Sequence, residues 1–208
     1  MKILLVDDFP VVVHGLKRLL LEEFPDAEIK EIPDSNSVIK FAKETEWDLM
    51  ILDIQMERKD GLEILREIIT WNKHKKILML SMFSEDIYAI RSMKLGASGY
   101  ITKSSAPEKL INAVKQILSG KKYISESLAE KLATRIKGKA DLSLHEQLSD
   151  GEMRVLSHLV KGKEVGEIAK ALSLSVSTIS TYRHRILKKM HMKSNSELIG
   201  YSIKHGLF

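Results

Sequence analysis

The feature that most constrains the fold of this chain is a regular alternation of short apolar runs and longer amphipathic stretches through its first 120 residues. Near-continuous apolar runs are typical of strands buried on both faces of a parallel sheet, and stretches with a helical period are typical of the helices that cover it. Five of each predict the α/β fold class, with a five-stranded, doubly wound parallel sheet. The strands are expected near Ile3–Val6, Glu28–Ile32, Leu49–Leu52, Ile77–Leu80 and Gly99–Ile101, and the helices over Val11–Phe24, Ser35–Glu44, Leu62–Trp71, Ile87–Leu95 and Pro107–Leu118.

Helix-capping signals agree with this pattern. Ser105 is followed three residues later by Glu108, which predicts a capping box at the start of the fifth helix, and Gly120 can end that helix. Ser149 and Glu152 repeat the same spacing and open a segment that has helical periods and no convincing strand pattern. The helices of this segment are expected at about 150–161, 165–172, 176–190 and 195–205.

Composition divides the chain into three parts. Residues 1–120 carry the α/β pattern, and residues 121–148 are polar and of mixed charge with one amphipathic stretch at Leu128–Ile136, which predicts a linker that contains a helix. Residues 149–208 are expected to form a second, all-α domain. They hold 10 Lys/Arg and 5 Asp/Glu, whereas the rest of the chain holds 23 of each, so the whole net charge of +5 lies in this domain. The asymmetry favours an anionic partner for the second domain.

Some classes of protein are excluded by what the sequence lacks. The chain has no cysteine, which rules out disulfides, thiolate zinc sites and cysteine nucleophiles. Nothing near the N-terminus has the pattern of a secretory leader, and no apolar run reaches the roughly eighteen residues that a membrane span requires. We therefore expect a cytoplasmic protein without a membrane partner.

Polar side chains stand at the ends of four of the five expected strands. Asp7 and Asp8 end the first strand, Asp53 the third and Ser81 the fourth, and Lys103 follows the fifth. Ligands of open α/β sheets bind at this end of the strands, so the five side chains are expected to converge. A single aspartate at such a place is more often a polar loop residue, but four strand ends together favour a joint role.

The chemistry of these groups indicates a phosphoryl-transfer site. A hard divalent cation relieves the repulsion between clustered carboxylates, and Mg²⁺ needs only two or three of them. An aspartate beside such a cation can act as an oxygen nucleophile toward a phosphoryl group, while Lys103 neutralises charge and Ser81 donates a hydrogen bond. The nearest histidine, His14, falls inside the first helical pattern, which argues against a hydrolase triad.

The segment from about Lys2 to Ser119 resembles the receiver domain of two-component response regulators. The motifs that carry the resemblance are "LLVDDFP", "DLMILDIQMERKDGLEIL", "ILMLS" and "GASGYITKSSAPEKL", in that order. The resemblance implies a flavodoxin-like fold with Asp53 as the phosphoacceptor. It also implies that Mg²⁺ is held by Asp8 directly, by Asp7 through water, by Asp53 and by the backbone carbonyl of Gln55. The remaining implied roles are Ser81 as the switching hydroxyl, Lys103 as a phosphoryl contact and Tyr100 as an aromatic switch.

The chain departs from the family pattern at several positions. Met56-Glu57 stands where Met-Pro is usual, and Phe9-Pro10 where His-Pro is usual in similar relatives. Gln55 and Phe83 occupy positions that tune dephosphorylation in the family, so the lifetime of the phosphoryl group is open. Tyr100 has an equal alternative as a half-buried strand residue, because aromatic residues favour strands.

The stretch "GKEVGEIAKALSLSVSTISTYRHRILKKM" contains two helical patterns joined by Leu172–Ser175. One side of the second pattern carries hydrogen-bond donors and positive charge, which a recognition helix needs for base edges and phosphates. An ordinary solvated face is the alternative. The other side is an expected packing stripe made of Val176, Ile179, Ile186, Leu187 and Met190.

The last 61 residues, from "LSDGEMRVL" to "YSIKHGLF", also resemble the LuxR-type DNA-binding domain, and the two parts together resemble the NarL–FixJ class of response regulators. The resemblance implies that Ser180, Thr181 and His184 contact base edges, and that Ser177, Thr178, Arg183 and Lys188 contact phosphates. Ser180 replaces a frequent lysine, and Gly151 replaces a bulkier polar residue. Relatives dimerise through the last helix, although its apolar residues are equally consistent with a core role.

We therefore predict a transcription factor and not an enzyme. A sensor histidine kinase would phosphorylate Asp53 with Mg²⁺, and the phosphorylated protein would dimerise and bind double-stranded promoter DNA. A metal-dependent phosphohydrolase is an alternative, but such enzymes usually have a second aspartate where Gln55 stands. A DNA-binding protein with a vestigial receiver is a further alternative, which the complete set of five strand-end residues disfavours.

Overall fold

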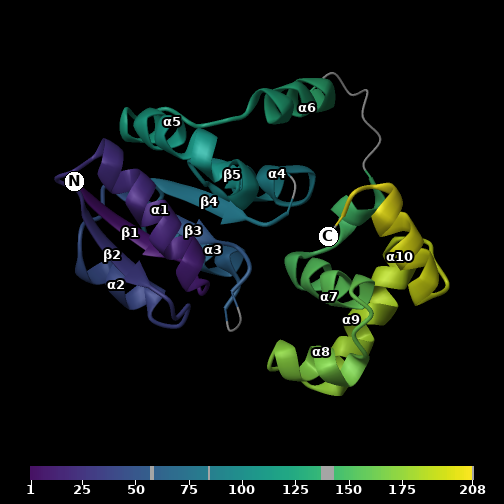
Figure 1. The fold of residues 1–208 in the computed structure, drawn as a ribbon. Coiled ribbons are helices and arrows are strands. Elements are labelled where there is room, and N and C mark those ends of the chain that lie inside the picture. Colours follow the sequence, from purple (N-terminus) through teal and green to yellow (C-terminus); the bar gives the residue numbers. More distant parts are fainter. Residues whose placement is uncertain (57–58, 84, 137–142, 208) are drawn as a thin grey trace. The chain divides into compact units, whose positions relative to one another are not determined.

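The computed structural model describes residues 1–56, 59–83, 85–136 and 143–207. The chain forms two compact units, Met1–Ala133 and Thr134–Phe208, which are considered separately (Figure 1). Glu57 and residues 137–142 of the expected linker lie outside the described residues. No helix in the described ranges is both long and apolar enough to cross a membrane.

The first unit is built on a five-stranded parallel sheet, as the sequence predicts. The strands lie in the order β2-β1-β3-β4-β5. From β1 the chain passes to β2 at one edge of the sheet, and it then crosses to β3 on the other side of β1. Ligands of such sheets bind where the order reverses, outside the C-terminal ends of β1 and β3. The strand bounds are β1 Lys2–Val6, β2 Glu28–Ile32, β3 Leu49–Asp53, β4 Ile77–Ser81 and β5 Gly99–Thr102.

Helices cover both faces of the sheet. Helices α1 and α5 share one face, where their apolar side chains pack with alternate residues of the strands in one core (Figure 1). This core includes Ile3, Leu5, Ile51, Leu78 and Leu80, all fully buried. The helix bounds are α1 Pro10–Glu23, α2 Val38–Glu44, α3 Gly61–Trp71, α4 Glu85–Leu95 and α5 Ala106–Leu118.

The start of α5 differs from the predicted capping box. A 3₁₀ turn, η1 (Lys103–Ser105), precedes the helix, and Ser105 has a helical backbone and makes no side-chain cap. The hydroxyl of Thr102 instead accepts the Ser105 N–H at 3.2 Å. The predicted end is confirmed, because Gly120 has φ +85° and Lys121 N–H donates to the Gln116 carbonyl at 3.1 Å.

Packing extends the first unit past Gly120. Tyr123 N–H donates to the Ser98 carbonyl at 2.8 Å, and its side chain is buried. Helix α6 (Glu126–Ile136) starts at Ser125, whose Oγ accepts the Leu128 N–H at 3.1 Å and donates to Glu85 Oε2 at 2.5 Å. Leu128 is buried as well, so the beginning of the expected linker packs on the α/β unit.

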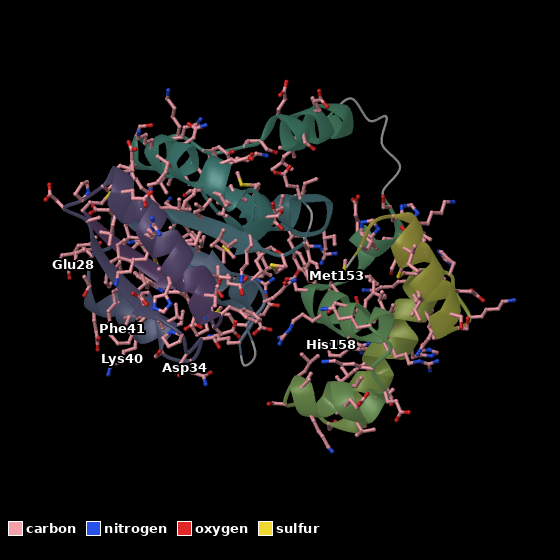
Figure 2. All side chains as sticks on the ribbon, viewed as in Figure 1. Glu28, Asp34, Lys40, Phe41, Met153 and His158 are labelled. Atoms are coloured by element: carbon pink, nitrogen blue, oxygen red, sulfur yellow. The ribbon has the colours of Figure 1, made fainter. Side chains whose placement is uncertain are left out.

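The second unit is helical. Its helices are η2 (Leu144–Gln147), α7 (Asp150–Val160), α8 (Val165–Ala171), α9 (Val176–Lys189) and α10 (Asn195–Lys204). The capping box at Ser149 is confirmed, because its Oγ accepts the Glu152 N–H while the Glu152 carboxylate accepts the Ser149 N–H. Met153, labelled in Figure 2, is fully buried in this unit together with Leu156, Ile168, Ile179, Ile186 and Leu198.

Candidate functional site

Three aspartates gather at the C-terminal edge of the sheet. Asp7 and Asp53 are fully buried and Asp8 is half-buried. One carboxylate oxygen from each can be chosen so that all three lie within 4.8 Å of one another. Oxygen donors at this spacing form a set that a hard divalent cation can bind.

The register of the sheet explains why these residues meet. Val6 of β1 is paired with Leu52 of β3, so the next residue on each strand, Asp7 or Asp53, stands at the same level of the edge. The turn into α1 then fixes Asp7, because the Phe9 N–H donates to Asp7 Oδ1 at 2.9 Å. The reversal point of the sheet therefore carries two buried carboxylates side by side.

Lys103 enters this cluster from the turn after β5. Its Nζ lies 2.7 Å from Asp7 Oδ2 and 3.0 Å from Asp53 Oδ2, and only 5% of its side chain is exposed. A buried lysine between two buried carboxylates offsets part of their mutual repulsion. The structure thus brings together Asp7, Asp8, Asp53 and Lys103, while Gln55 lies in the loop two residues beyond Asp53, the last residue of β3.

The ionisation of Asp53 is strongly perturbed. Burial raises the pKa of its carboxyl to about 6, against the opposing effect of the Lys103 ammonium, and the neighbouring Asp7 carboxylate raises it further. A bound cation would act in the opposite sense, since positive charge favours the carboxylate. The site therefore has a buried carboxyl group whose charge depends on what binds beside it.

Ser81 and Tyr100 lie on the neighbouring strands and are both buried. The Phe83 N–H donates to Ser81 Oγ at 3.0 Å, and the Tyr100 hydroxyl donates to the Phe83 carbonyl at 2.9 Å. The backbone of Phe83 therefore joins the two side chains. Its ring stacks on Tyr88 of α4, with centroids 5.6 Å apart. The connecting role of Phe83 was not apparent from its sequence position.

Two further residues shape the site without a clear signal in the sequence. A Cβ on Gly61 would stand 2.1 Å from the Asp53 carbonyl oxygen, so only glycine allows α3 to start this close to β3. The Asp60-Gly61 pair ahead of a helical pattern is the one sequence signal for it. The Phe9 ring lies over the Lys103 ammonium, with 5.1 Å from Nζ to the ring centroid.

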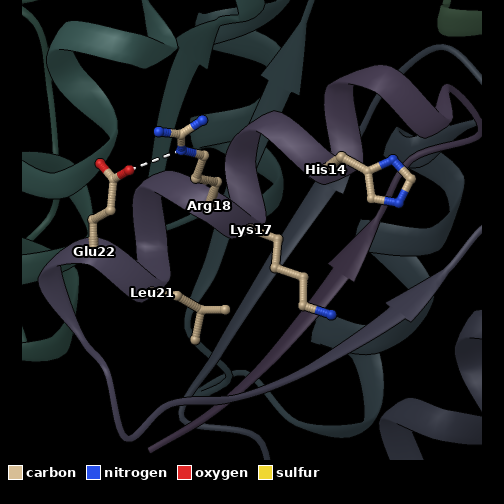
Figure 3. A pocket seen from close by; sticks show the side chains of 5 residues that line it. All are labelled: His14, Lys17, Arg18, Leu21 and Glu22. Carbon is tan, nitrogen blue, oxygen red and sulfur yellow. Dashed lines mark hydrogen bonds and ion pairs between the residues drawn. The ribbon is translucent and has the colours of Figure 1, made fainter.

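A separate pocket of about 420 Å³ lies on the surface of α1 (Figure 3). Its lining includes the ion pair between Arg18 Nε and Glu22 Oε1 at 2.9 Å, drawn as a dashed line, and the side chains of His14, Lys17 and Leu21. None of the strand-end residues lines it. This pocket is therefore separate from the aspartate cluster.

The second unit contains a helix-turn-helix. Helix α8 ends at Ala171, and the turn includes Ser173 with φ +53°. Ser175 caps α9, because its Oγ accepts the Thr178 N–H at 3.1 Å. The turn is therefore short and is held by local hydrogen bonds, which is typical of a helix-turn-helix.

The exposed side of α9 carries most of the predicted contact residues. Ser177, Ser180, Thr181, His184 and Lys188 are exposed, and Thr178 and Arg183 are half-buried. Arg183 Nε donates to Asn195 Oδ1 at 2.8 Å, which ties α9 to the start of α10.

The predicted packing stripe of α9 is wrong at its first residue. Ile179, Ile186 and Met190 are buried and Leu187 is half-buried, but Val176 is 56% exposed. Val176 is the first residue of the helix, and its side chain is not part of the buried core of this unit. Gly151, a departure from the LuxR pattern, lies against the ring of Tyr182, whose hydroxyl would be 3.1 Å from a Cβ.

Comparison with known proteins gives the same two-part organisation. The family model described as "Response regulator receiver domain" matches residues 3–115, and "Bacterial regulatory proteins, luxR family" matches residues 146–202. The response regulator UvrY of Escherichia coli is 31% identical over 206 residues, which cover 99% of this chain and 94% of that protein. The response regulator GacA of Pseudomonas aeruginosa is 30% identical over 207 residues, or 99% and 97% of the two chains.

A solved structure matches along the whole chain. RcsB from Salmonella enterica serovar Typhimurium, bound to promoter P1flhDC in the presence of phosphomimetic BeF3⁻, has a TM-score of 0.70 and 25% sequence identity. The match covers 97% of each chain. Both the α/β unit and the helical unit thus have counterparts, in the same order, in a single known protein.

Proposed function

The chain belongs to the response regulators of two-component systems in which a receiver domain precedes a LuxR-type DNA-binding domain, and we propose that phosphorylation of Asp53 controls its binding to promoter DNA. We assign the receiver to residues 1–120, a linker to 121–148 and the DNA-binding domain to 149–208. The single observation that carries the proposal is the cluster of Asp7, Asp8 and Asp53 with the Lys103 ammonium between two of them.

The phosphoryl group comes from a sensor histidine kinase. A carboxylate oxygen of Asp53 attacks the phosphorus of the kinase phosphohistidine, the P–N bond breaks and an aspartyl phosphate forms. Lys103, already 3.0 Å from Asp53 Oδ2, neutralises charge on the phosphoryl oxygens. Asp7, Asp8, Asp53 and the backbone carbonyl of Gln55 would hold Mg²⁺, which supplies further positive charge to the phosphoryl oxygens.

The switch passes through Ser81 and Tyr100. In this structure Ser81 Oγ accepts a hydrogen bond from Phe83, and in the phosphorylated protein the same hydroxyl moves to donate its O–H to a phosphoryl oxygen. Because the Phe83 carbonyl also accepts from Tyr100, a shift of this loop changes the environment of Tyr100. Phosphorylation then shifts the population toward a homodimer that binds double-stranded DNA.

Helix α9 is the recognition element of this proposal. Exposed short polar side chains at Ser180, Thr181 and His184 suit base edges in the major groove. The residues for the phosphate backbone are Ser177, Thr178, Arg183 and Lys188. The net charge of +5 in residues 149–208 and the promoter complex of RcsB support this assignment.

Labelling with a small phosphodonor tests the phosphoacceptor. Acetyl phosphate with Mg²⁺ should label the wild-type protein and Asp26→Asn, a variant at an exposed aspartate, but not Asp53→Asn. Selection of bound sequences from random DNA should then yield a site that the labelled protein binds more tightly. Label retained by Asp53→Asn would overturn the assignment. Sustained hydrolysis of a small phosphoester would favour a phosphohydrolase.

A further inference from the structure

Phe9 has an unusual position for a large apolar residue. It lies in the turn between β1 and α1, and 56% of its surface is exposed. Its backbone N–H binds Asp7 Oδ1 at 2.9 Å, and its ring centroid lies 5.1 Å from Lys103 Nζ. An ammonium at this distance from an aromatic ring is attracted by the negative face of the π system.

The Phe9 ring is the exposed neighbour of the ammonium. Among the residues that the structure describes, Asp7, Asp53 and the Phe9 ring all lie close to Lys103 Nζ. Asp7 and Asp53 are fully buried, whereas Phe9 is more than half exposed, and yet only 5% of the Lys103 side chain is exposed. The two carboxylates therefore contact the ammonium from the buried interior, and Phe9 is the one of these three neighbours that also reaches solvent.

Phosphorylation changes two of these three partners. One oxygen of Asp53 becomes part of the acyl phosphate, and Asp7 takes part in charge balance around the new group. The Phe9 ring gains and loses no charge or covalent bond in the transfer, so its π face is the one of the three contacts that is chemically unchanged. A cation held by a π face also keeps its charge available, because the ring does not neutralise it.

We propose that Phe9 is a positioning residue that holds the Lys103 ammonium against the phosphoryl group of Asp53 and excludes water from it. This inference rests on the proposed phosphorylation of Asp53. In the hydrolysis that Phe9 slows, water attacks phosphorus, the bond between phosphorus and the Asp53 oxygen breaks, and the carboxylate and inorganic phosphate are released. Phe9 thereby sets the lifetime of the phosphorylated state, which the sequence leaves open.

Side-chain variants of the full-length protein separate the π face from simple bulk. Phe9→Trp keeps an aromatic face, Phe9→Leu keeps apolar bulk without one, and Val11→Ala changes an exposed apolar residue nearby as a control. After labelling with acetyl phosphate and removal of the donor, Phe9→Leu should lose phosphate about two- to fivefold faster than the wild type. Phe9→Trp and Val11→Ala should stay within about twofold of the wild type.

A double-mutant cycle shows whether Phe9 acts through Lys103. In a Lys103→Met background, Phe9→Leu should cause no further change in the rate of phosphate loss, since the cation it positions is gone. A full additional effect in that background would overturn the proposal. Equal lifetimes for wild type, Phe9→Leu and Phe9→Trp would overturn it as well.

The contact itself can be measured without phosphorylation. In NMR spectra of the Mg²⁺-free protein, the Lys103 ε-methylene protons should be shifted upfield by the Phe9 ring, and Phe9→Leu should abolish the shift while Val11→Ala preserves it. An unshifted methylene in the wild type would overturn the proposal. Failure of the wild type to accept any label would instead overturn the proposed function, on which the role of Phe9 depends.

Discussion

At the scale of single residues, the charges of the acidic cluster destabilise the ligand-free fold, and a bound cation would relieve this destabilisation. Asp53 is fully buried beside Asp7, and its pKa of about 6 shows that ionisation inside the fold is unfavourable compared with ionisation in water. Lys103 offsets part of this cost. A site that is strained by its own charge gains stability when a cation binds, which couples ligand binding to the stability of the receiver.

Neutralising Asp53, the proposed phosphoacceptor, should therefore stabilise the metal-free protein. Because the pKa of Asp53 rises from 3.8 to about 6 on folding, the folded protein binds this proton more tightly, and the free energy of unfolding falls as pH rises between these values. At pH 7.5 the free energy of unfolding of Asp53→Asn should exceed that of the wild type by up to about 3 kcal/mol. Urea unfolding titrations in the presence of a metal chelator, at pH 7.5 and at pH 4, measure this free energy of unfolding.

The stabilisation by Asp53→Asn should shrink toward pH 4, and the exposed control Asp26→Asn should show no comparable gain. Added Mg²⁺ should stabilise the wild type more than Asp53→Asn. A variant that is less stable than the wild type at pH 7.5 would contradict the role of burial.

Gly61→Ala should distort the aspartate cluster, although Gly61 is not one of the residues of the cluster. The new Cβ would lie 2.1 Å from the Asp53 carbonyl oxygen and 2.7 Å from Ile54 Cα, so the end of β3 or the start of α3 has to move. We expect a loss of about 1–3 kcal/mol in unfolding free energy and slower phosphorylation by acetyl phosphate. Gly15→Ala, in α1 with nothing within 4 Å, should instead stabilise by up to about 1 kcal/mol. Equal behaviour of the two variants would contradict the steric argument.

Part of the site could be predicted residue by residue from the sequence. Asp7, Asp8 and Asp53 follow apolar runs, and the rule that parallel strands share one ligand edge is enough to bring them together. Phe9 and Gly61 could not be found this way. Their importance lies in contacts with Lys103 and Asp53, which belong to other elements and depend on how closely the backbones approach.

At the scale of elements, local signals were reliable where hydrogen bonds stay within a few residues. The Ser149 capping box formed as predicted, whereas the one at Ser105 did not, because Thr102 at the end of β5 captured the Ser105 N–H. Val176 has the apolar character of a core residue but starts its helix outside the packed part. At Ser105 a competing local hydrogen bond, three residues earlier, displaced the predicted box, whereas at Val176 the position of the residue in the folded unit decided the outcome.

Helix α6 offers a direct test of this kind of contact. Ser125→Ala removes both the acceptor for the Leu128 N–H and the partner of Glu85 at the start of α4. We expect a loss of about 1 kcal/mol and faster hydrogen exchange at the amides that begin α6. Ser119→Ala is the matched control, since its hydroxyl bonds only to the Gln116 carbonyl of its own helix. Unchanged exchange in α6 would show that Ser125 does not hold the helix.

At the scale of the whole molecule, charge and core are divided between two units. Residues 149–208 carry the entire net charge of +5, and each unit has its own buried apolar residues. The fold class could be predicted because it follows from the alternation of strand and helix periods, whereas periodicity does not determine the order of the strands. The extent of the first unit could not, since residues 121–133 join it through Tyr123 and Leu128 and have a linker-like composition.

The excess charge predicts salt-dependent DNA binding. Lys188→Ala should weaken binding on all sequences and lower the slope of log K against log salt by about 1, because one phosphate contact is lost. Thr181→Ala should instead change the preferred sequence, since its side chain is assigned to base edges. Lys204→Ala, at an exposed lysine at the end of α10, serves as the control. Fluorescence anisotropy over a salt series measures all three, and an unchanged slope for Lys188→Ala would remove it from the interface.

The bond between Tyr123 and Ser98 has a consequence for the behaviour of the protein in concentrated solution. An open sheet leaves the outer side of its last strand able to pair with a strand of another molecule, which is a route to aggregation. Tyr123 occupies such a place beside Gly99 on β5, while β2, on the opposite side, is short and carries Glu28, Lys30 and Glu31. A receiver cut after Gly120 would lose this pairing, so we expect it to aggregate more readily in concentrated solution than a receiver that retains Tyr123.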